Sequence, residues 1–169
     1  ISEMQGILNG TTNFILTRME GGMDYAAALT EAQELGYAEA VPDADVLGWD
    51  ALAKVTILAN TVFGASLEPD DTPCVGITEI TPEQIEAAAV DGKKYKLIGR
   101  VWRDGAAVRA SVGPQLVDSS HPLAGVGGAT NAMTITTDTL GDVTIVGPGA
   151  GRRETGFSLL IDLIHLGRS

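Results

Sequence analysis

The sequence contains little of several residue types, and each shortage excludes a class of protein. Cys74 is the single cysteine among 169 residues, so no internal disulfide can form and the chain suits a reducing cytoplasm. Eleven basic residues stand against 22 acidic ones, and the formal charge of -11 makes nucleic acid and anionic membranes poor partners. No run of about 18 apolar residues could span a bilayer. We therefore expect a soluble, cytoplasmic protein that binds neither nucleic acid nor membrane.

Two further absences concern metals and nucleotides. His121 and His165 are the only histidines, and neither has companions at the spacing of zinc ligands, so we predict structural roles for both and no metal site. A glycine-rich dinucleotide fingerprint after a strand is also missing. The chain begins at Ile1, directly ahead of a motif. We expect it to be a piece of a longer protein, whose main nucleotide-binding domain, if it uses such a cofactor, lies upstream.

The composition that remains fits one domain over residues 1–169, with 44% hydrophobic and 20% charged residues. The first half favours helices. Thr11 or Thr12 is the expected cap of the first helix, and Asp24 is the expected cap of the second. Capping residues, prolines and glycines predict helices over residues 11–20, 24–36, 49–63 and 82–89.

The second half favours strands. An Asp-Gly turn between two alternating apolar runs predicts a β-hairpin over residues 94–117, and residues 131–137 and 142–146 predict a second strand pair. Residues 155–166 carry apolar residues at helical spacing, so a final helix is expected to cover the sheet. Helices followed by antiparallel strands predict an α+β fold, with helices packed on one face of a mainly antiparallel or mixed sheet.

The most informative segment is residues 36–54, GYAEAVPDADVLGWDALAK, which combines an irregular acidic loop with the start of a helix. Asp50 and Lys54 are four positions apart, so their side chains share one helix face and can meet. Such a pair on a solvated surface contributes only about 0.2–0.5 kcal/mol. The spacing therefore leaves two interpretations open, a surface ion pair and a substrate site that also includes Glu39 and Asp45.

A second segment, GILNGTTNFIL at residues 6–16, adds specificity. Together with GYAEA, the acidic run that ends at Lys54, and the later HPLA and GPGAG, it resembles the homoserine dehydrogenase family in the same order along the whole chain, most weakly over residues 65–95. The resemblance implies the catalytic and dimerisation domain of an NAD(P)-dependent enzyme. That enzyme interconverts L-homoserine and L-aspartate 4-semialdehyde in threonine, isoleucine and methionine biosynthesis. The cofactor would be bound mainly by the upstream domain, so this chain alone is expected to be inactive, and it would pair as a homodimer through its sheet.

The resemblance also implies roles for the acidic segment. Glu39 and Asp45 would bind polar groups of the substrate, its ammonium above all. Asp50 would orient Lys54, which would donate a proton to the aldehyde oxygen in the reductive direction and accept it in the other. A permanently charged Lys54 that stabilises the developing alkoxide is an equally physical role, and the sequence leaves both open.

Six further residues are candidates for ligand contacts. Gly10 and Thr11, at the start of the first helix, would receive the substrate carboxylate, unless Thr11 only caps the helix. Tyr37 would contact the substrate or pack between helix and loop. The glycines of the GPGAG turn would let the backbone approach the cofactor, or would only form a turn; these are Gly147, Gly149 and Gly151.

The chain departs from the family at a few positions. Val41 stands where an aspartate is usual, Val146 stands where an aromatic residue is common, and Glu154 and Gly156 replace a proline and an alanine. The change at Val41 puts one substrate or packing contact in doubt, and the changes over residues 152–156 weaken the assignment of a cofactor contact. The rival hypothesis is a non-catalytic binding or oligomerisation module that retains the fold, and the presence of Lys54 argues against it.

Overall fold

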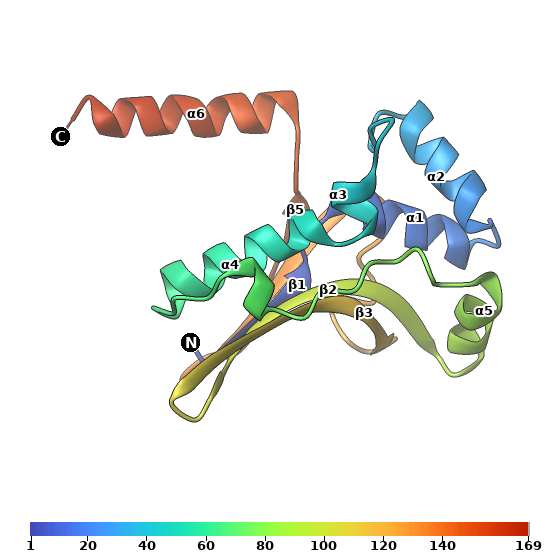
Figure 1. Ribbon diagram of the computed structural model, residues 1–169, viewed down its shortest axis with the longest axis horizontal. Coiled ribbons are helices and arrows are strands. Elements are labelled where there is room, and N and C mark those ends of the chain that lie inside the picture. The colour runs from blue at the N-terminus through green and yellow to red at the C-terminus, as the bar shows by residue number, and fades with distance from the viewer. Residues whose placement is uncertain (169) are drawn as a thin grey trace.

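The computed structural model describes residues 1–168 and is organised around a five-stranded sheet (Figure 1). The strand order is β3-β2-β1-β4-β5, and every neighbouring pair is antiparallel. The predicted α+β class and both strand pairs are confirmed. The strands are β1 (Glu3–Ile7), β2 (Lys93–Asp104), β3 (Ala107–Asp118), β4 (Thr130–Thr137) and β5 (Gly141–Pro148).

The central strand, β1, was not predicted from the sequence. It pairs on one side with β2, where Glu3 lies opposite Trp102, and on the other with β4, where Glu3 lies opposite Thr136. A Cβ atom at Gly6 would overlap the backbone of Ala132, so glycine permits the close approach of β4. The strand owes its existence to partners about a hundred positions away, which a local pattern does not reveal.

Most predicted helices are confirmed, with one correction at a cap. Asp24 caps the second helix as predicted, accepting a hydrogen bond from the amide of Ala27. Neither Thr11 nor Thr12 caps the first helix, because Asn9 takes that place and accepts from the amide of Thr12. The helices of the first half are α1 (Gly10–Glu20), α2 (Tyr25–Glu34), α3 (Asp43–Val46), α4 (Trp49–Val62) and α5 (Pro82–Val90), with a 3-10 turn η1 (Pro69–Asp71).

The main core lies between the helices and one face of the sheet. Val55 of α4 is fully buried, and a Cβ atom at Gly99 of β2 would come within 2.6 Å of it. Glycine at that position therefore lets α4 lie close against β2. A smaller cluster on the opposite face joins Ile7, Ile98 and Ala132 to the segment after β3. The position of α4 matters for function because the helix carries Asp50 and Lys54 on the side that faces the start of α1.

The prediction that the final helix covers the sheet is wrong. Helix α6 (Arg152–Leu166) starts three residues earlier than predicted and extends away from the other elements (Figure 1). None of its residues is buried, and Phe157 and Leu163 are 62% and 66% exposed. An apolar face indicates that a helix needs a partner without saying which surface provides it. No helix within residues 1–168 is both long enough and apolar enough to cross a membrane.

Candidate active site

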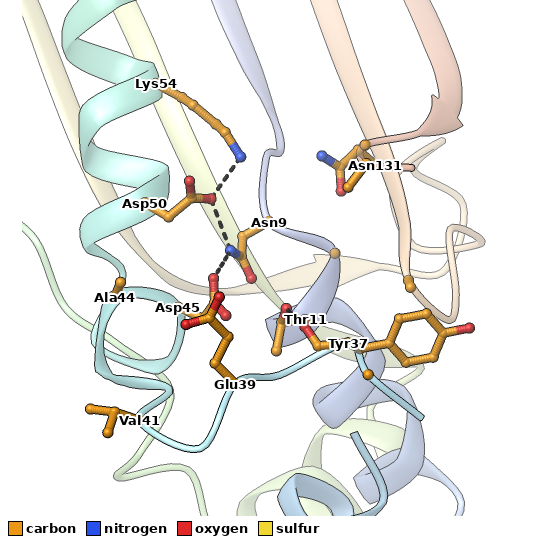
Figure 2. A pocket seen from close by; sticks show the side chains of 15 residues that line it. Asn9, Thr11, Tyr37, Glu39, Val41, Ala44, Asp45, Asp50, Lys54 and Asn131 are labelled. Carbon is orange, nitrogen blue, oxygen red and sulfur yellow. Dashed lines mark hydrogen bonds and ion pairs between the residues drawn. The ribbon is translucent and has the colours of Figure 1, made fainter. Parts of the chain in front are cut away.

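A cavity of about 500 Å³ opens where the start of α1, the loop before α4, and the turn after β5 meet (Figure 2). Chain segments far apart in the sequence contribute to its wall. All of the predicted catalytic and substrate-binding residues line it: Gly10, Thr11, Tyr37, Glu39, Asp45, Asp50 and Lys54. Of the three glycines predicted to contact a cofactor, Gly149 lines the cavity, whereas Gly147 and Gly151 are not part of its wall.

Lys54 is bound at two points. Its Nζ lies 2.6 Å from Asp50 Oδ2, the partner that the spacing predicted, and 2.8 Å from the carbonyl oxygen of Leu8. The second bond crosses from α4 to the segment between β1 and α1, so the ammonium is directed across the wall of the cavity. An ion pair on a solvated surface would not include a hydrogen bond from the lysine to a distant backbone carbonyl such as that of Leu8. The geometry therefore favours the interpretation of a built site over that of a surface ion pair.

Asn9 is the residue that the sequence interpretation missed. Its Nδ2 donates to Asp45 Oδ1 at 2.6 Å and to Asp50 Oδ2 at 2.9 Å. Figure 2 shows the resulting chain of contacts, which runs from Lys54 through Asp50 and Asn9 to Asp45. The signal that could have found it is local, since asparagine is among the best N-cap residues and stands directly before the helix.

Two further carboxylates line the cavity, that of Glu39 from the loop before α4 and that of Asp45 from the short helix α3. Neither forms an ion pair with a described lysine or arginine. Acids without a protein cation are suited to a cationic ligand group. Val41 is 74% exposed and its side chain carries no charge, so it adds nothing to this acidic cluster.

Thr11 and Tyr37 are joined to each other. The hydroxyl of Thr11 donates to the backbone carbonyl of Tyr37 at 2.7 Å, which ties the loop to the start of α1. The ring of Tyr37 lies 4.9 Å from that of Phe14, which is the packing role considered from the sequence. A Cβ atom at Gly10 would come within 2.7 Å of the carbonyl oxygen of Ala129. Packing thus explains the glycine, while its amide still stands at the positive end of a helix.

The GPGAG segment leads into α6, as predicted, but its first two residues belong to the end of β5, and two of its glycines have structural reasons of their own. A Cβ atom at Gly149 would overlap the side-chain amide of Asn131, and one at Gly151 would overlap the carboxylate of Glu154. Nothing occupies the space beside Gly147. Asn131 was not predicted from the sequence, although it lines the cavity and donates to the carbonyl of Leu8 at 3.2 Å.

The site shows no sign of a metal centre of its own. Within residues 1–168, no three or more His, Cys, Asp or Glu side chains come together in a way that could hold a metal ion. The chemistry available to this cavity is that of one lysine, three carboxylates, two asparagines and a helix N-terminus. Such a set can bind an amino acid and handle one proton at its reactive end.

Comparison with known proteins agrees with this chemistry. The family model for homoserine dehydrogenase matches residues 1–164. The chain belongs to the homoserine dehydrogenase family. It is 50% identical over 170 residues to the NAD(+)-dependent homoserine dehydrogenase of Pseudomonas canavaninivorans, covering 100% of this chain and 48% of that protein. It is 42% identical to the homoserine dehydrogenase of Bacillus subtilis (strain 168), covering 97% of this chain and 38% of the relative.

Solved homoserine dehydrogenase structures share the fold. The S. aureus enzyme superimposes with a TM-score of 0.94 at 40% identity, covering 99% of this chain and 43% of that structure. A hyperthermophilic archaeal homoserine dehydrogenase mutant in complex with NADPH gives a TM-score of 0.80 at 32% identity, covering 97% of this chain and 46% of the structure. The chain thus spans less than half the length of these relatives.

Proposed function

We propose that this chain supplies the substrate site of an enzyme that interconverts L-homoserine and L-aspartate 4-semialdehyde with NAD(P), in the biosynthesis of threonine, isoleucine and methionine. The observation that carries the proposal is Lys54, held by Asp50 and the Leu8 carbonyl in a cavity that also contains Glu39 and Asp45. Family membership supports the same reaction. The Pseudomonas relative is named for NAD(+) and the archaeal structure contains NADPH, so either nicotinamide cofactor is compatible with the proposal.

Each group of the substrate has a complementary group in the cavity. The ammonium binds between the carboxylates of Glu39 and Asp45. The carboxylate faces the backbone amides at the start of α1, at Gly10 and Thr11, where the helix end carries partial positive charge. The reactive oxygen then lies toward Lys54. This orientation uses both ends of the cavity and leaves one polar group, the lysine, for the atom that reacts.

Lys54 manages the charge on that oxygen. In the reductive direction the ammonium donates a proton to the aldehyde oxygen, and in the oxidative direction the amine removes a proton from the hydroxyl. Asp50 holds Nζ in place at 2.6 Å and balances its charge. The Leu8 carbonyl accepts a hydrogen bond from a second N–H of the ammonium at 2.8 Å, so the third N–H is available to the substrate.

The residues present fit contact with the reactive end of the cofactor only. Gly149 and Ala150 form part of the cavity wall and expose backbone there, whereas no dinucleotide-binding motif occurs in the chain. A nicotinamide cofactor supplies the hydride, and we propose that a nucleotide-binding domain outside this chain holds most of it. On this proposal the isolated chain is inactive, and the whole enzyme acts in the cytoplasm.

We also propose a homodimer that forms through the sheet. Gln5 lies opposite Arg100 of β2, so both side chains share the face away from α4, and the Arg100 side chain is 38% exposed. Antiparallel sheets offer such a face for self-complementary pairing. Sedimentation equilibrium is expected to give twice the chain mass, and a monomer at micromolar concentration would contradict the proposed dimer.

The reaction is tested in the full-length protein by following homoserine-dependent reduction of NAD(P)⁺. Lys54→Ala is expected to lower kcat by at least ~100-fold, the low end of general acid-base catalysis, with an unchanged circular dichroism spectrum. A folded wild-type protein that binds homoserine without oxidising it would support the rival hypothesis of a binding module. A Lys54→Ala protein with a near-wild-type rate would remove Lys54 from the mechanism.

A further inference from the structure

We propose that Asn9 is a positioning residue, which holds the substrate-facing Asp45 and the lysine-orienting Asp50 in one fixed arrangement. This inference rests on the proposed function, because it assigns the two carboxylates their roles in that reaction. The residues lie on three separate segments, the turn before α1 for Asn9, the short helix α3 for Asp45, and the first turn of α4 for Asp50. The side chain of Asn9 therefore connects these three segments through its hydrogen bonds to Asp45 and Asp50.

The carboxamide of Asn9 uses every hydrogen-bonding position that it has. A carboxamide offers two donor hydrogens and two acceptor lone pairs. The Nδ2 hydrogens go to Asp45 and Asp50, and Oδ1 accepts from the amide of Thr12 at 2.9 Å and from its hydroxyl at 3.0 Å. A rotated amide would place its oxygen against two carboxylates and its nitrogen against the backbone N–H of Thr12. Only the observed orientation is therefore compatible with its surroundings.

Burial makes this arrangement consequential. Asn9 is only 5% exposed, so water cannot readily replace its donor groups. Without them, Asp45 and Asp50 would face each other as like charges in a partly buried place, where such repulsion is stronger than in bulk water. Charge-assisted hydrogen bonds to carboxylates are also among the strongest in proteins. The Asn9 amide thus offsets the repulsion between Asp45 and Asp50 by donating a hydrogen bond to each of them.

The two bonds predict two separable kinetic effects. Asp50 Oδ2 accepts from both Lys54 and Asn9, so loss of Asn9 displaces Asp50 and with it the group that meets the reactive oxygen. Asp45 binds Asn9 through Oδ1, so the same loss also displaces an acid that binds the substrate ammonium. The first effect lowers kcat, and the second raises KM for homoserine. A residue that only supported the helix would produce neither.

The experiment uses Asn9→Asp and Asn9→Ser in the full-length protein, with wild type and Lys54→Ala measured beside them. Aspartate and serine are both good N-cap residues, so α1 keeps its cap, while the Nδ2 group that donates to both carboxylates is lost. For Asn9→Asp we expect a kcat about 100-fold lower, the scale of a displacement of about 1 Å in an active site, and a KM for homoserine about 10-fold higher. Asn9→Ser is expected to lose less, because it adds no third negative charge.

The matched control is Asn13→Asp, one turn further along α1. Asn13 is also buried and does not itself line the cavity, and its Nδ2 donates to the carbonyl oxygens of Val126 and Thr130 and to no carboxylate. The same chemical change there is expected to lower the melting temperature while leaving kcat and KM within about threefold. If Asn13→Asp reproduces the kinetic losses of Asn9→Asp, the role of Asn9 is structural and the proposal is wrong.

The outcomes separate this inference from the proposed function. An inactive wild-type protein refutes the function. An active wild type, an inactive Lys54→Ala protein and an Asn9→Asp protein with unchanged kcat and KM refute the role of Asn9 alone. If both Asn9 variants fail to fold, exchange of the side-chain amide hydrogens decides in wild type: those of Asn9 are expected to exchange far more slowly than those of the exposed Asn60. Equal exchange rates would overturn the proposal.

Discussion

Lys54 and Asn131 donate to the same atom, the carbonyl oxygen of Leu8, at 2.8 and 3.2 Å. Lys54 reaches it from α4 and Asn131 reaches it from β4, so two walls of the cavity are connected through one backbone group. A carbonyl oxygen has two lone pairs and can accept both bonds. The position of the lysine thus depends on the central region of the fold as well as on its own helix.

The ion pair of Lys54 is expected to matter for turnover far more than for stability. The side chains of Lys54 and Asp50 are 43% and 34% exposed. Ion pairs that are exposed to solvent contribute about 0–1 kcal/mol to the free energy of unfolding. Asp50→Asn is therefore expected to lower the free energy of unfolding by less than about 1 kcal/mol. It should lower kcat about 100-fold, because the lysine loses its orientation. A urea denaturation series and steady-state kinetics give the two numbers, and a large stability loss with normal kcat would reverse the argument.

Gly149 is expected to be required because of Asn131. A Cβ atom at Gly149 would overlap the Asn131 amide, so Gly149→Ala should force the GPGAG turn or the amide to move. Overpacking of this kind costs about 1–3 kcal/mol. Adding Asn131→Ala removes the obstruction, and the double variant is expected to recover most of the stability lost by Gly149→Ala alone. Additive losses in thermal denaturation would show that the two residues do not interact.

Glu20 is expected to be important for stability because it holds two lysines of β2. Lys96 Nζ lies 3.1 Å from one carboxylate oxygen and Lys94 Nζ lies 3.0 Å from the other. The Lys96 side chain is only 1% exposed. Glu20→Gln leaves this buried cation without its anion and should lower the free energy of unfolding by about 3 kcal/mol. Lys94→Gln is the control, and since Lys94 is 41% exposed it should cost less than about 1 kcal/mol.

The same pair predicts a pH dependence. Burial lowers the pKa of Lys96 below its ordinary value of 10.5, and Glu20 opposes that shift. Between the folded pKa and 10.5 the unfolded chain binds the proton more tightly, so this contribution to the free energy of unfolding increases as the pH rises. The deficit of Glu20→Gln relative to wild type is therefore expected to shrink at alkaline pH. Denaturation series at neutral pH and near pH 10 measure this difference in the free energy of unfolding. A difference that is the same at both pH values would show that Lys96 is not responsible.

Helix α6 is expected to contribute little to the stability of this chain. None of its residues is buried, and the apolar side chains of Phe157, Leu160 and Leu163 are each more than half exposed. Ending the chain after Gly151 should leave the melting temperature unchanged within about 2 °C, because little apolar area leaves water when the helix forms. It should also reduce binding of a hydrophobic dye. A large drop in melting temperature would mean that α6 packs on the domain in solution.

Local chemistry accounts for the parts of this protein that its sequence could predict. Asp24 caps a helix, and Lys54 meets Asp50 because four residues make about one helical turn. The β2–β3 hairpin forms as predicted, although its turn consists of Gly105 and Ala106, one residue later than the Asp-Gly pair. In each case the interacting groups are near neighbours in the chain. The acidic segment and the resemblance to a known family can likewise be recognised from the order of residues along the chain.

Tertiary structure alone decided the remainder. Asn9 reaches Asp45 and Asp50 across 36 and 41 positions, and Leu8 meets Asn131 across 123. Strand β1 exists because β2 and β4 lie on either side of it. The apolar pattern of α6 predicted a buried face, yet the helix lies away from the sheet. A sequence specifies which groups can bond and which faces avoid water; only the folded chain determines which of them come together, because those contacts depend on the path of the whole backbone.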